Sequence, residues 1–117
     1  MKRVQAAILR RRGKVYEVLL LRRVKNQGWF WQNITGKVES RETFKNGLLR
    51  EIKEESSIKR KDILKITKIF SYDFILEKVR EEVFLVEVAP NTIVDISNNV
   101  VLEHDKYGWF KWIMRLD

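Results

Sequence analysis

The sequence predicts a single α+β domain, in which several strands surround one helix. Three observations lead to this fold class. The chain has 117 residues, which is enough for one hydrophobic core but not for two. Apolar residues recur at helical spacing in one stretch only, from residue 43 to residue 55. Most other apolar stretches are short, rich in β-branched and aromatic residues, and bounded by turn residues.

The first elements form a predicted hairpin. Residues 4–10 and 14–22 are strand-like and are separated by the basic turn at residues 11–13. A loop follows at residues 26–28, and then the aromatic cluster Trp29–Trp31. Three successive aromatic residues more often anchor the edge of a core than bind a ligand, so we expect this cluster to pack inward.

The helix predicted at residues 43–55 has a clear apolar stripe and a polar N-terminus. Ser40 or Thr43 can supply the N-cap oxygen. The stripe consists of Phe44, Leu48, Leu49 and Ile52.

A second hairpin is predicted after the helix. Its strands are residues 63–74 and 82–88, joined by a polar turn at residues 77–81. Residues 91–99 are polar and predict a loop, and the aromatic-rich residues 107–113 predict a final strand.

Composition restricts the possible functions. The chain contains no cysteine, which excludes a disulfide framework and a thiolate metal site, so any metal must be bound by oxygen or imidazole. No apolar run is long enough to span a bilayer, and the N-terminus does not resemble a signal peptide. We therefore expect a cytoplasmic protein.

The basic charge of the chain indicates which partners it could bind. The formal net charge of +8 favours phosphate-bearing partners, although a solvated basic surface without a ligand explains charge alone equally well. Basic residues gather at 10–12, 22–23 and 59–61, so RNA remains a possible partner.

Three carboxylates form an acidic face beside the apolar stripe of the predicted helix. Glu51 lies three residues before Glu54 and four before Glu55, so like charges meet at a cost of about 0.2–0.5 kcal/mol per pair. Gly47, in mid-helix, costs a further ~0.5–1 kcal/mol relative to alanine. A divalent cation would offset these costs, and Gly47 would leave room above it. Neutralisation of a solvated face by Arg50 and Lys53 is the alternative.

The surrounding sequence favours a metal site over a solvated acidic face. The segment 36–58 resembles the Nudix box, whose pattern is G-x5-E-x7-R-E-U-x-E-E-x-G-U with U an apolar residue. Ile52 and Ile58 match the apolar positions, and Ser57 departs from the pattern by replacing the usual glycine at the end of the helix. We expect this departure to rearrange or strain the C-cap without touching a metal ligand. The fixed positions are filled by Gly36, Glu42, Arg50, Glu51, Glu54 and Glu55.

The resemblance implies a Nudix α/β/α sandwich around a mixed sheet, and a site for Mg²⁺ or Mn²⁺. The implied metal ligands are Glu51, Glu54, Glu55 and the backbone carbonyl of Gly36 or its neighbour. Glu51 is implied to be a ligand or the base that acts on water. Glu42 and Arg50 are implied to orient the carboxylates.

Residues 31–39 and 103–109 are similar, more loosely, to the branch that contains bacterial dATP and dihydroneopterin triphosphate pyrophosphohydrolases. Enzymes of the family often place a further glutamate near the metal, and Glu103 is the candidate here for a ligand or general base, with a surface carboxylate as the alternative. We expect His104 to make a structural hydrogen bond.

The resemblance also suggests substrate-binding residues. Arg22 or Arg23 is expected to hold a phosphate, and because neighbours on a strand face opposite sides, the other would point away. Trp31 and Gln32 belong to the similar segment and are candidates for contact with the substrate.

Together these observations predict an Mg²⁺-dependent pyrophosphohydrolase of nucleoside triphosphates such as dATP, with catalytic residues Glu51, Glu54 and Glu103. One alternative substrate is a dinucleoside polyphosphate or the 5′ end of RNA, and another alternative is a nucleotide- or RNA-binding module without catalysis. The family usually has a second long helix after the final strand, where this sequence has only residues 113–117. We therefore expect either a longer natural chain or coverage by a partner subunit, and hence an exposed apolar patch or a homodimer.

Overall fold

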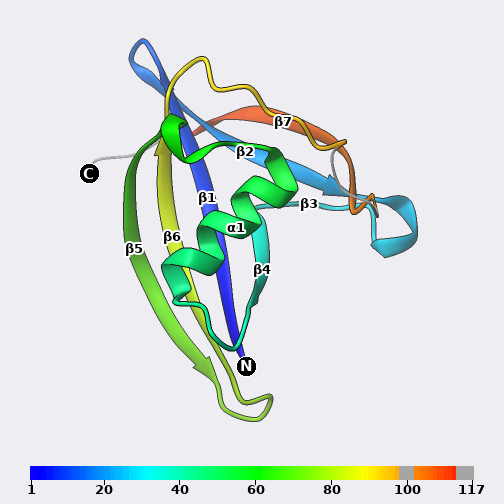
Figure 1. Cartoon of the computed structure of the whole chain (residues 1–117). Helices are drawn as coiled ribbons and strands as arrows, with labels where there is room; N and C mark the ends of the chain where they lie inside the picture. The colour runs from blue at the N-terminus through cyan, green and yellow to red at the C-terminus, as the bar shows by residue number, and fades with distance from the viewer. Residues whose placement is uncertain (98–101, 113–117) are drawn as a thin grey trace.

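The computed structural model describes residues 1–97 and 102–112. These residues form one seven-stranded sheet with strand order β3-β2-β1-β6-β5, in which β4 also pairs with β1 and β7 also pairs with β2 (Figure 1). The elements in chain order are β1 (Lys2–Arg12), β2 (Val15–Arg23), the 3₁₀ turn η1 (Lys25–Gln27), β3 (Trp31–Gln32), β4 (Ile34–Val38), α1 (Phe44–Ser56), the 3₁₀ turn η2 (Arg60–Asp62), β5 (Ile63–Phe74), β6 (Val79–Val88) and β7 (His104–Trp112).

Strand β1 organises the sheet. It runs parallel to β6 along almost its whole length, antiparallel to β4 in its first half and antiparallel to β2 in its second half. Alternate residues Val4, Ala6 and Ile8 are buried on the side of α1, as the period of a strand requires. The expected α+β fold with a mixed sheet is confirmed.

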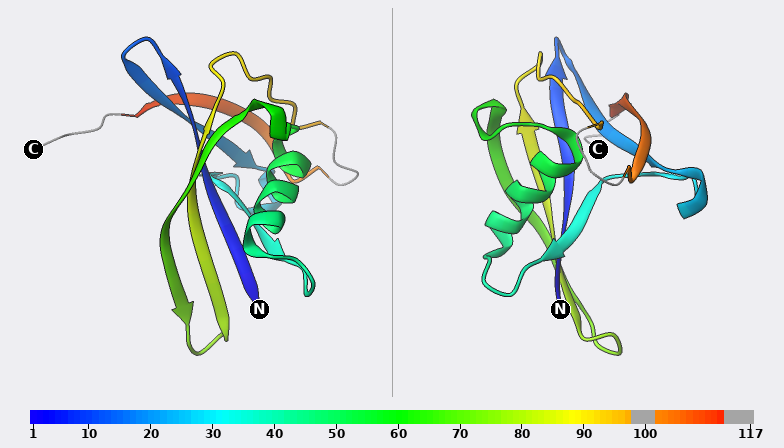
Figure 2. Two further views of the ribbon diagram at one scale, coloured as in Figure 1. Left: turned by 60° about the vertical axis from the view of Figure 1, so that its left-hand side comes forward. Right: turned by 45° about the vertical axis from the view of Figure 1, so that its right-hand side comes forward.

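Helix α1 packs on one side of this sheet (Figure 2). Leu48 and Ile52 are fully buried there, and burial of each contributes about 1.5–3 kcal/mol. Thr43 is the N-cap residue, since its hydroxyl accepts a hydrogen bond from the backbone N–H of Asn46 at 3.1 Å. Ser57 ends the helix in the left-handed conformation with φ 63°, which is the conformation that glycine usually adopts at this position.

Gly47 has a different role from the one expected. A Cβ atom at this position would approach the side chain of Val38 to 3.1 Å, so the glycine allows α1 to lie close to β4. The expectation that Gly47 leaves room above a metal is wrong, because its missing side chain faces the sheet.

The sheet surface opposite α1, which we call the open face, is defined by Leu9, Tyr16, Leu85 and Phe110. Phe110 is 42% exposed there and contacts Trp31 edge-on, with 5.2 Å between the ring centroids. No second α-helix covers this face in the part of the chain that the structure describes (Figure 2). The expected exposed apolar patch is therefore present, and the expected position of a second helix, residues 113–117, lies outside the described residues.

Most predicted elements agree with the structure to within a few residues. The predicted strand at residues 63–74 coincides with β5, whereas β6 begins earlier than predicted, at Val79. The predicted loop at residues 91–99 is described only as far as residue 97, and it contains no helix or strand there. Among the described residues, no helix is long and apolar enough to cross a membrane.

One prediction about the aromatic cluster was wrong, and two short strands next to the cluster were not predicted. Trp29, Phe30 and Trp31 do not pack inward, and their exposed fractions are 51%, 49% and 38%. Strands β3 and β4 were not predicted, since β3 has two residues and β4 has a glycine at its centre.

Candidate active site

The site begins where β4 passes under the second half of α1. Gly36 is buried in β4, and a Cβ atom added to it would overlap the carboxylate of Glu51. Only glycine therefore allows the Glu51 side chain to lie against this strand. Gly36 and Glu51 are both fixed positions of the Nudix pattern, but the pattern alone did not show that they lie against each other.

Arg50 holds the carboxylates of the site in place. Its Nε and Nη2 atoms donate hydrogen bonds to the two oxygens of Glu42, at 2.8 and 2.9 Å. Its Nη1 atom donates to Glu51 at 3.0 Å and to Glu54 at 3.2 Å. A further bond from Nη2 to the carbonyl of Lys37, at 2.8 Å, attaches the guanidinium to β4. The fixed, planar donor set of arginine suits this arrangement, in which one side chain orients three carboxylates.

Glu42 remains ionised as a result. The hydrogen bonds from Arg50, and then the one from the backbone N–H of Glu39, lower the pKa of Glu42 to about 2. The same contacts raise the pKa of Arg50. The pair is therefore a fixed ionic support for the residues that face the site.

Glu55 is in a different environment. It is buried, with 5% of its surface exposed, and its Oε2 atom has no hydrogen-bond partner among the described residues. Burial raises the pKa of Glu55 to about 8, and the charges of Glu51 and Glu103 act in the same direction. A carboxylate oxygen that is buried without a partner is costly unless a cation or proton compensates it.

Glu51 shares this environment in part. Burial raises its pKa, the hydrogen bond from Arg50 opposes this effect, and the charges of Glu54 and Glu103 add to it. Glu103 therefore belongs to the same cluster of charges as the helix glutamates, although it is far away in the sequence. Its backbone carbonyl accepts a hydrogen bond from Val24 N–H at 3.0 Å, which fixes the end of its loop next to β2.

The two arginines at the end of β2 lie on opposite sides, as expected. Arg23 faces the helix glutamates: its guanidinium is 3.8 Å from Glu103, and its charge lowers the pKa of Glu55. Arg22 instead makes two hydrogen bonds to Asp105, at 2.9 and 3.2 Å, on the open face. Of the two arginines, Arg23 is therefore the one that lies beside the acidic cluster.

The candidate substrate residues Trp31 and Gln32 are separated in the same way. Trp31 pairs with Arg22 in the strand register and lies over its guanidinium, with 5.8 Å between Arg22 Cζ and the ring centroid. Gln32 lies on the side of α1, and its amide nitrogen is 3.2 Å from Nε2 of His104. The structure thus brings Gln32, but not Trp31, to the side of the glutamates.

His104 has the structural role expected for it. It is almost completely buried, and burial, followed by the charge of Arg23, lowers its pKa to about 4. The ring is therefore neutral near pH 7, and its Nε2 accepts the hydrogen bond from Gln32. Its Nδ1 atom is buried without a partner in the described part of the chain.

The donor set suits a hard divalent cation. Glu51, Glu54 and Glu55 supply carboxylate oxygens, and the unpartnered oxygen of Glu55 is the strongest sign that positive charge is needed there. In the described residues, however, no three acidic or imidazole groups already converge as a complete metal site, since Arg50 holds Glu51 and Glu54. Cation binding would therefore require these carboxylates to turn from Arg50.

Comparison with known proteins identifies the fold and the sequence pattern. A protein-family model described as NUDIX domain matches residues 1–113. Among solved structures, an Ap4A hydrolase from C. elegans superposes with a TM-score of 0.72 and 22% identity, over 94% of this chain and 79% of that chain. The dihydroneopterin triphosphate pyrophosphohydrolase of E. coli gives a TM-score of 0.63 and 25% identity, over 93% of this chain and 79% of that chain.

One curated relative is much longer than this chain. An octanoyltransferase from Myxococcus xanthus is 30% identical over an alignment of 115 residues that covers 93% of this chain. The chain spans only 30% of the length of that protein. The activity in its name is therefore not assigned to this chain.

Proposed function

The chain belongs to the Nudix family and is a pyrophosphohydrolase-type enzyme, and we propose that it hydrolyses nucleoside triphosphates such as dATP to a monophosphate and pyrophosphate. The observation that carries the proposal is the buried carboxylate of Glu55, whose Oε2 atom has no hydrogen-bond partner in the described part of the chain and which feels the charge of Glu51. A purely structural helix would gain nothing from such a group.

We propose Mg²⁺ as the cofactor, with Mn²⁺ as a possible substitute. Glu51, Glu54, Glu55 and the Gly36 carbonyl would hold it. When bound, the cation neutralises phosphate charge and makes water a better nucleophile.

Side chains of the protein bind the substrate, accept the proton and hold the carboxylates in position. Arg23 holds the oxygens of a substrate phosphate on the side of α1. Glu103, which is partly exposed, accepts a proton from a water molecule while the oxygen of that water attacks phosphorus and the phosphoanhydride bond breaks. The electron pair of that bond leaves with pyrophosphate, and Glu103 then releases the proton to solvent. Arg50 and Glu42 keep the helix carboxylates in position throughout.

A panel of nucleoside triphosphates with pyrophosphate detection tests the proposal. We expect turnover that requires Mg²⁺ or Mn²⁺ and that falls at least about 100-fold in Glu54→Gln. Glu103→Gln should lower kcat about 100-fold with little change in KM, as expected for loss of a general base. Glu77→Gln, in the exposed turn between β5 and β6, is a control that should retain wild-type rates. Unchanged metal-dependent turnover in Glu54→Gln would refute the metal assignment.

A second substrate class is supported by the surface charge. The chain carries a net charge of +8, and one of the similar structures is an Ap4A hydrolase. A dinucleoside polyphosphate or the 5′-triphosphate end of RNA is therefore the alternative substrate. Comparison of kcat/KM for dATP, diadenosine tetraphosphate and triphosphate-ended RNA would decide between them. Nucleotide binding without hydrolysis of any of the three would instead indicate a non-catalytic module.

A further inference from the structure

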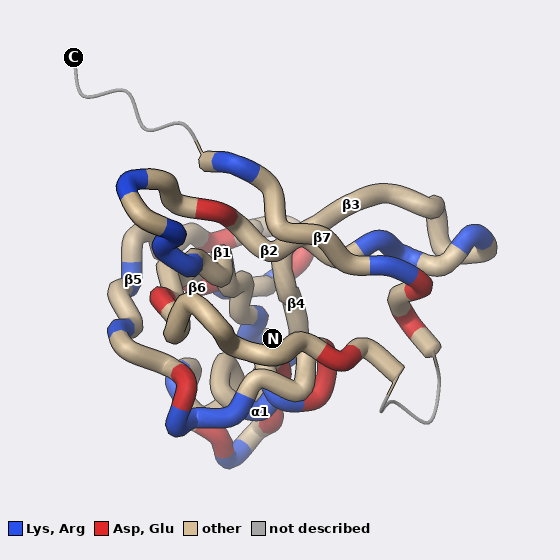
Figure 3. The backbone as a smooth tube through the Cα atoms, turned by 90° about the horizontal axis from the view of Figure 1, so that it is seen from above, with Lys and Arg blue, Asp and Glu red and all other residues tan. Residues whose placement is uncertain are grey.

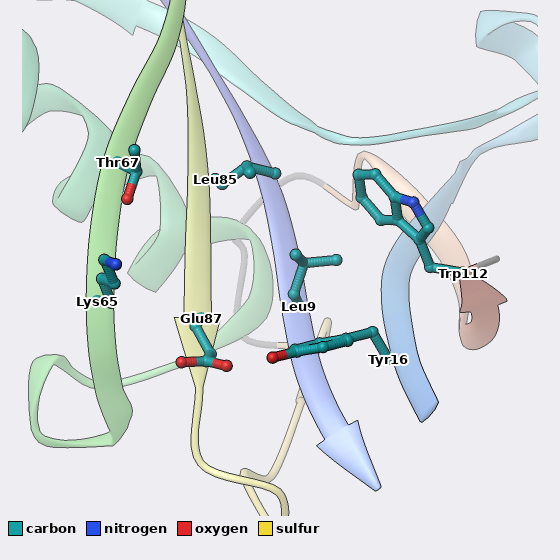
Figure 4. Close-up of a pocket in the computed structure, with 7 residues that line it drawn as sticks. All are labelled: Leu9, Tyr16, Lys65, Thr67, Leu85, Glu87 and Trp112. Carbon is teal, nitrogen blue, oxygen red and sulfur yellow. The ribbon is translucent and has the colours of Figure 1, made fainter. Parts of the chain in front are cut away.

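A pocket of about 260 Å³ lies on the open face, on the other side of the sheet from the helix glutamates. Figure 4 shows its side chains in front of the sheet while the helix lies behind. Leu9 and Leu85 form an apolar base, and the rings of Tyr16 and Trp112 stand on one side. The polar groups of Lys65, Thr67 and Glu87 stand on the other. An apolar surface with a few polar groups at its border is typical of a ligand site.

Aromatic rings continue from this pocket across the open face. Tyr16 pairs with Trp112 in the register of β2 and β7, and Phe110 lies two residues before Trp112 on the same face. Phe110 in turn contacts Trp31. Since these rings are partly exposed, their surfaces are available to a flat partner.

Basic side chains border the same surface. Arg11 pairs with Tyr16 across β1 and β2, and its guanidinium lies 6.0 Å from the centre of that ring. Glu87 stands opposite Lys65 in the register of β5 and β6, but no carboxylate of a described residue forms an ion pair with Arg11, Lys14 or Lys65. Figure 3 shows this concentration of basic residues at the turn between β1 and β2 and along β5. The partner of this surface should therefore carry negative charge.

We propose that the open face is a second binding site, for single-stranded nucleic acid, separate from the active site. Arg11 and Lys65 contact phosphates, while Tyr16, Trp112 and Phe110 provide surfaces on which bases stack. Unpaired bases stack on aromatic side chains without need for a particular sequence, and a basic border follows the phosphate backbone. A duplex hides the faces of its bases, and a neutral protein partner would leave the basic border uncompensated. This proposal does not depend on the proposed hydrolysis.

Fluorescence anisotropy with a labelled RNA of about ten nucleotides tests the proposal. The RNA ends in a 5′-hydroxyl and no divalent metal is added, so that the active site has no phosphoanhydride to bind or cleave. We expect saturable binding that weakens about 20-fold between about 50 and about 200 mM salt, as for contact with roughly three phosphates. Single-stranded DNA of the same sequence should also bind. Tighter binding of RNA than of DNA would indicate contact with the 2′-hydroxyl. A duplex should bind more weakly than either single strand.

Two matched double variants distinguish binding at the open face from attraction by the net charge of the whole chain. Arg11→Glu with Lys65→Glu should weaken binding at least about tenfold. Lys45→Glu with Lys53→Glu changes the net charge equally but alters α1, and it should stay within about twofold of wild type. Trp112→Ala should cost about tenfold through lost stacking. Circular dichroism checks that each variant is folded. If Trp112→Ala does not fold, the comparison of the two charge variants alone tests whether the open face binds the oligonucleotide.

Several results would overturn the proposal. These are an absence of oligonucleotide binding at low salt, equal losses in the two charge variants, or duplex binding as tight as single-strand binding. A dimer in light scattering that Trp112→Ala converts to a monomer, without oligonucleotide binding, would instead assign the open face to a second copy. Nucleoside triphosphate turnover is measured separately and should persist in Arg11→Glu with Lys65→Glu, so failure of this site and failure of the proposed enzyme are distinguishable.

Discussion

Arg50 and Glu42 form a two-point ionic pair, with Nε and Nη2 of the guanidinium at 2.8 and 2.9 Å from the two carboxylate oxygens. This pair fixes the plane of the guanidinium, and the remaining nitrogen can then reach Glu51 and Glu54. The positions of Glu51 and Glu54 therefore depend on a residue that lies before the helix.

Arg50→Lys should impair catalysis more than folding. A lysine keeps the charge but cannot donate two parallel hydrogen bonds to Glu42 while also holding Glu51. We expect kcat/KM and metal affinity to fall about 10- to 100-fold. Metal titration and steady-state kinetics measure these effects, and Glu39→Gln is the control, because its exposed carboxylate is 4.0 Å from Arg50. Equal losses in both variants would contradict the role of the pair.

The two glycines of the segment should respond differently to substitution by alanine. In Gly36→Ala the new methyl group overlaps the carboxylate of Glu51, so we expect a loss of activity of about 100-fold or more with the sheet retained. In Gly47→Ala the atoms nearest to the methyl group belong to the Val38 side chain, at 3.1 to 3.4 Å, and the helix gains propensity of about 0.5–1 kcal/mol. Its activity should remain close to wild type. Kinetics and thermal unfolding of both variants test this contrast.

These glycines illustrate what the sequence could predict. The pattern of residues 36–58 was sufficient to identify the acidic cluster, because its spacing reflects both a helix and its approach to a strand. It could not show that Gly47 faces Val38 and that Gly36 makes room for Glu51, since both contacts depend on how α1 lies across β4. Helical period placed Gly47 beside the acidic residues and gave no information about Gly36, which precedes the helix.

The aromatic cluster shows a second limit. Hydrophobicity predicted burial for Trp29–Trp31, but the apolar side of a sheet is buried only if another element covers it. Strand alternation did predict that Arg22 and Arg23 face opposite sides, although the side that faces the glutamates followed only from the register with β7, where Arg23 pairs with His104.

Stability without metal should fall as the pH rises from 6.5 to 8. The pKa of Glu55 is about 8 in the folded state and 4.5 as its ordinary value, so the folded state holds an extra proton between these limits and loses stability as pH rises. Glu51 acts in the same direction. His104 has the opposite effect, because its pKa of about 4 lies below the ordinary value of 6.5, but only about 0.4 kcal/mol of its contribution is still to be gained above pH 6.5.

Urea unfolding at several pH values with a chelator measures this loss, which should be on the order of 1–3 kcal/mol. In Glu55→Gln, most of the fall in the free energy of unfolding above pH 6.5 should be absent. Addition of Mg²⁺ at pH 8 should stabilise wild type more than Glu55→Gln, because the cation replaces the missing proton. A wild-type slope that persists unchanged in Glu55→Gln would assign the titration to another group.

Ser57 should tolerate glycine better than alanine. It adopts φ 63° at the end of α1, a conformation that costs a residue with a Cβ atom about 1 kcal/mol. Its hydroxyl donates a hydrogen bond to the carbonyl of Asp95 at 2.7 Å, which contributes about 0.5–1.5 kcal/mol. Ser57→Gly loses the bond but relieves the strain, so its free energy of unfolding should stay within about 0.5 kcal/mol of wild type. Ser57→Ala loses the bond and keeps the strain, and it should be destabilised by about 1 kcal/mol. Denaturant unfolding of both variants provides the comparison, and an alanine variant at least as stable as the glycine variant would show that the left-handed conformation is not strained at this position.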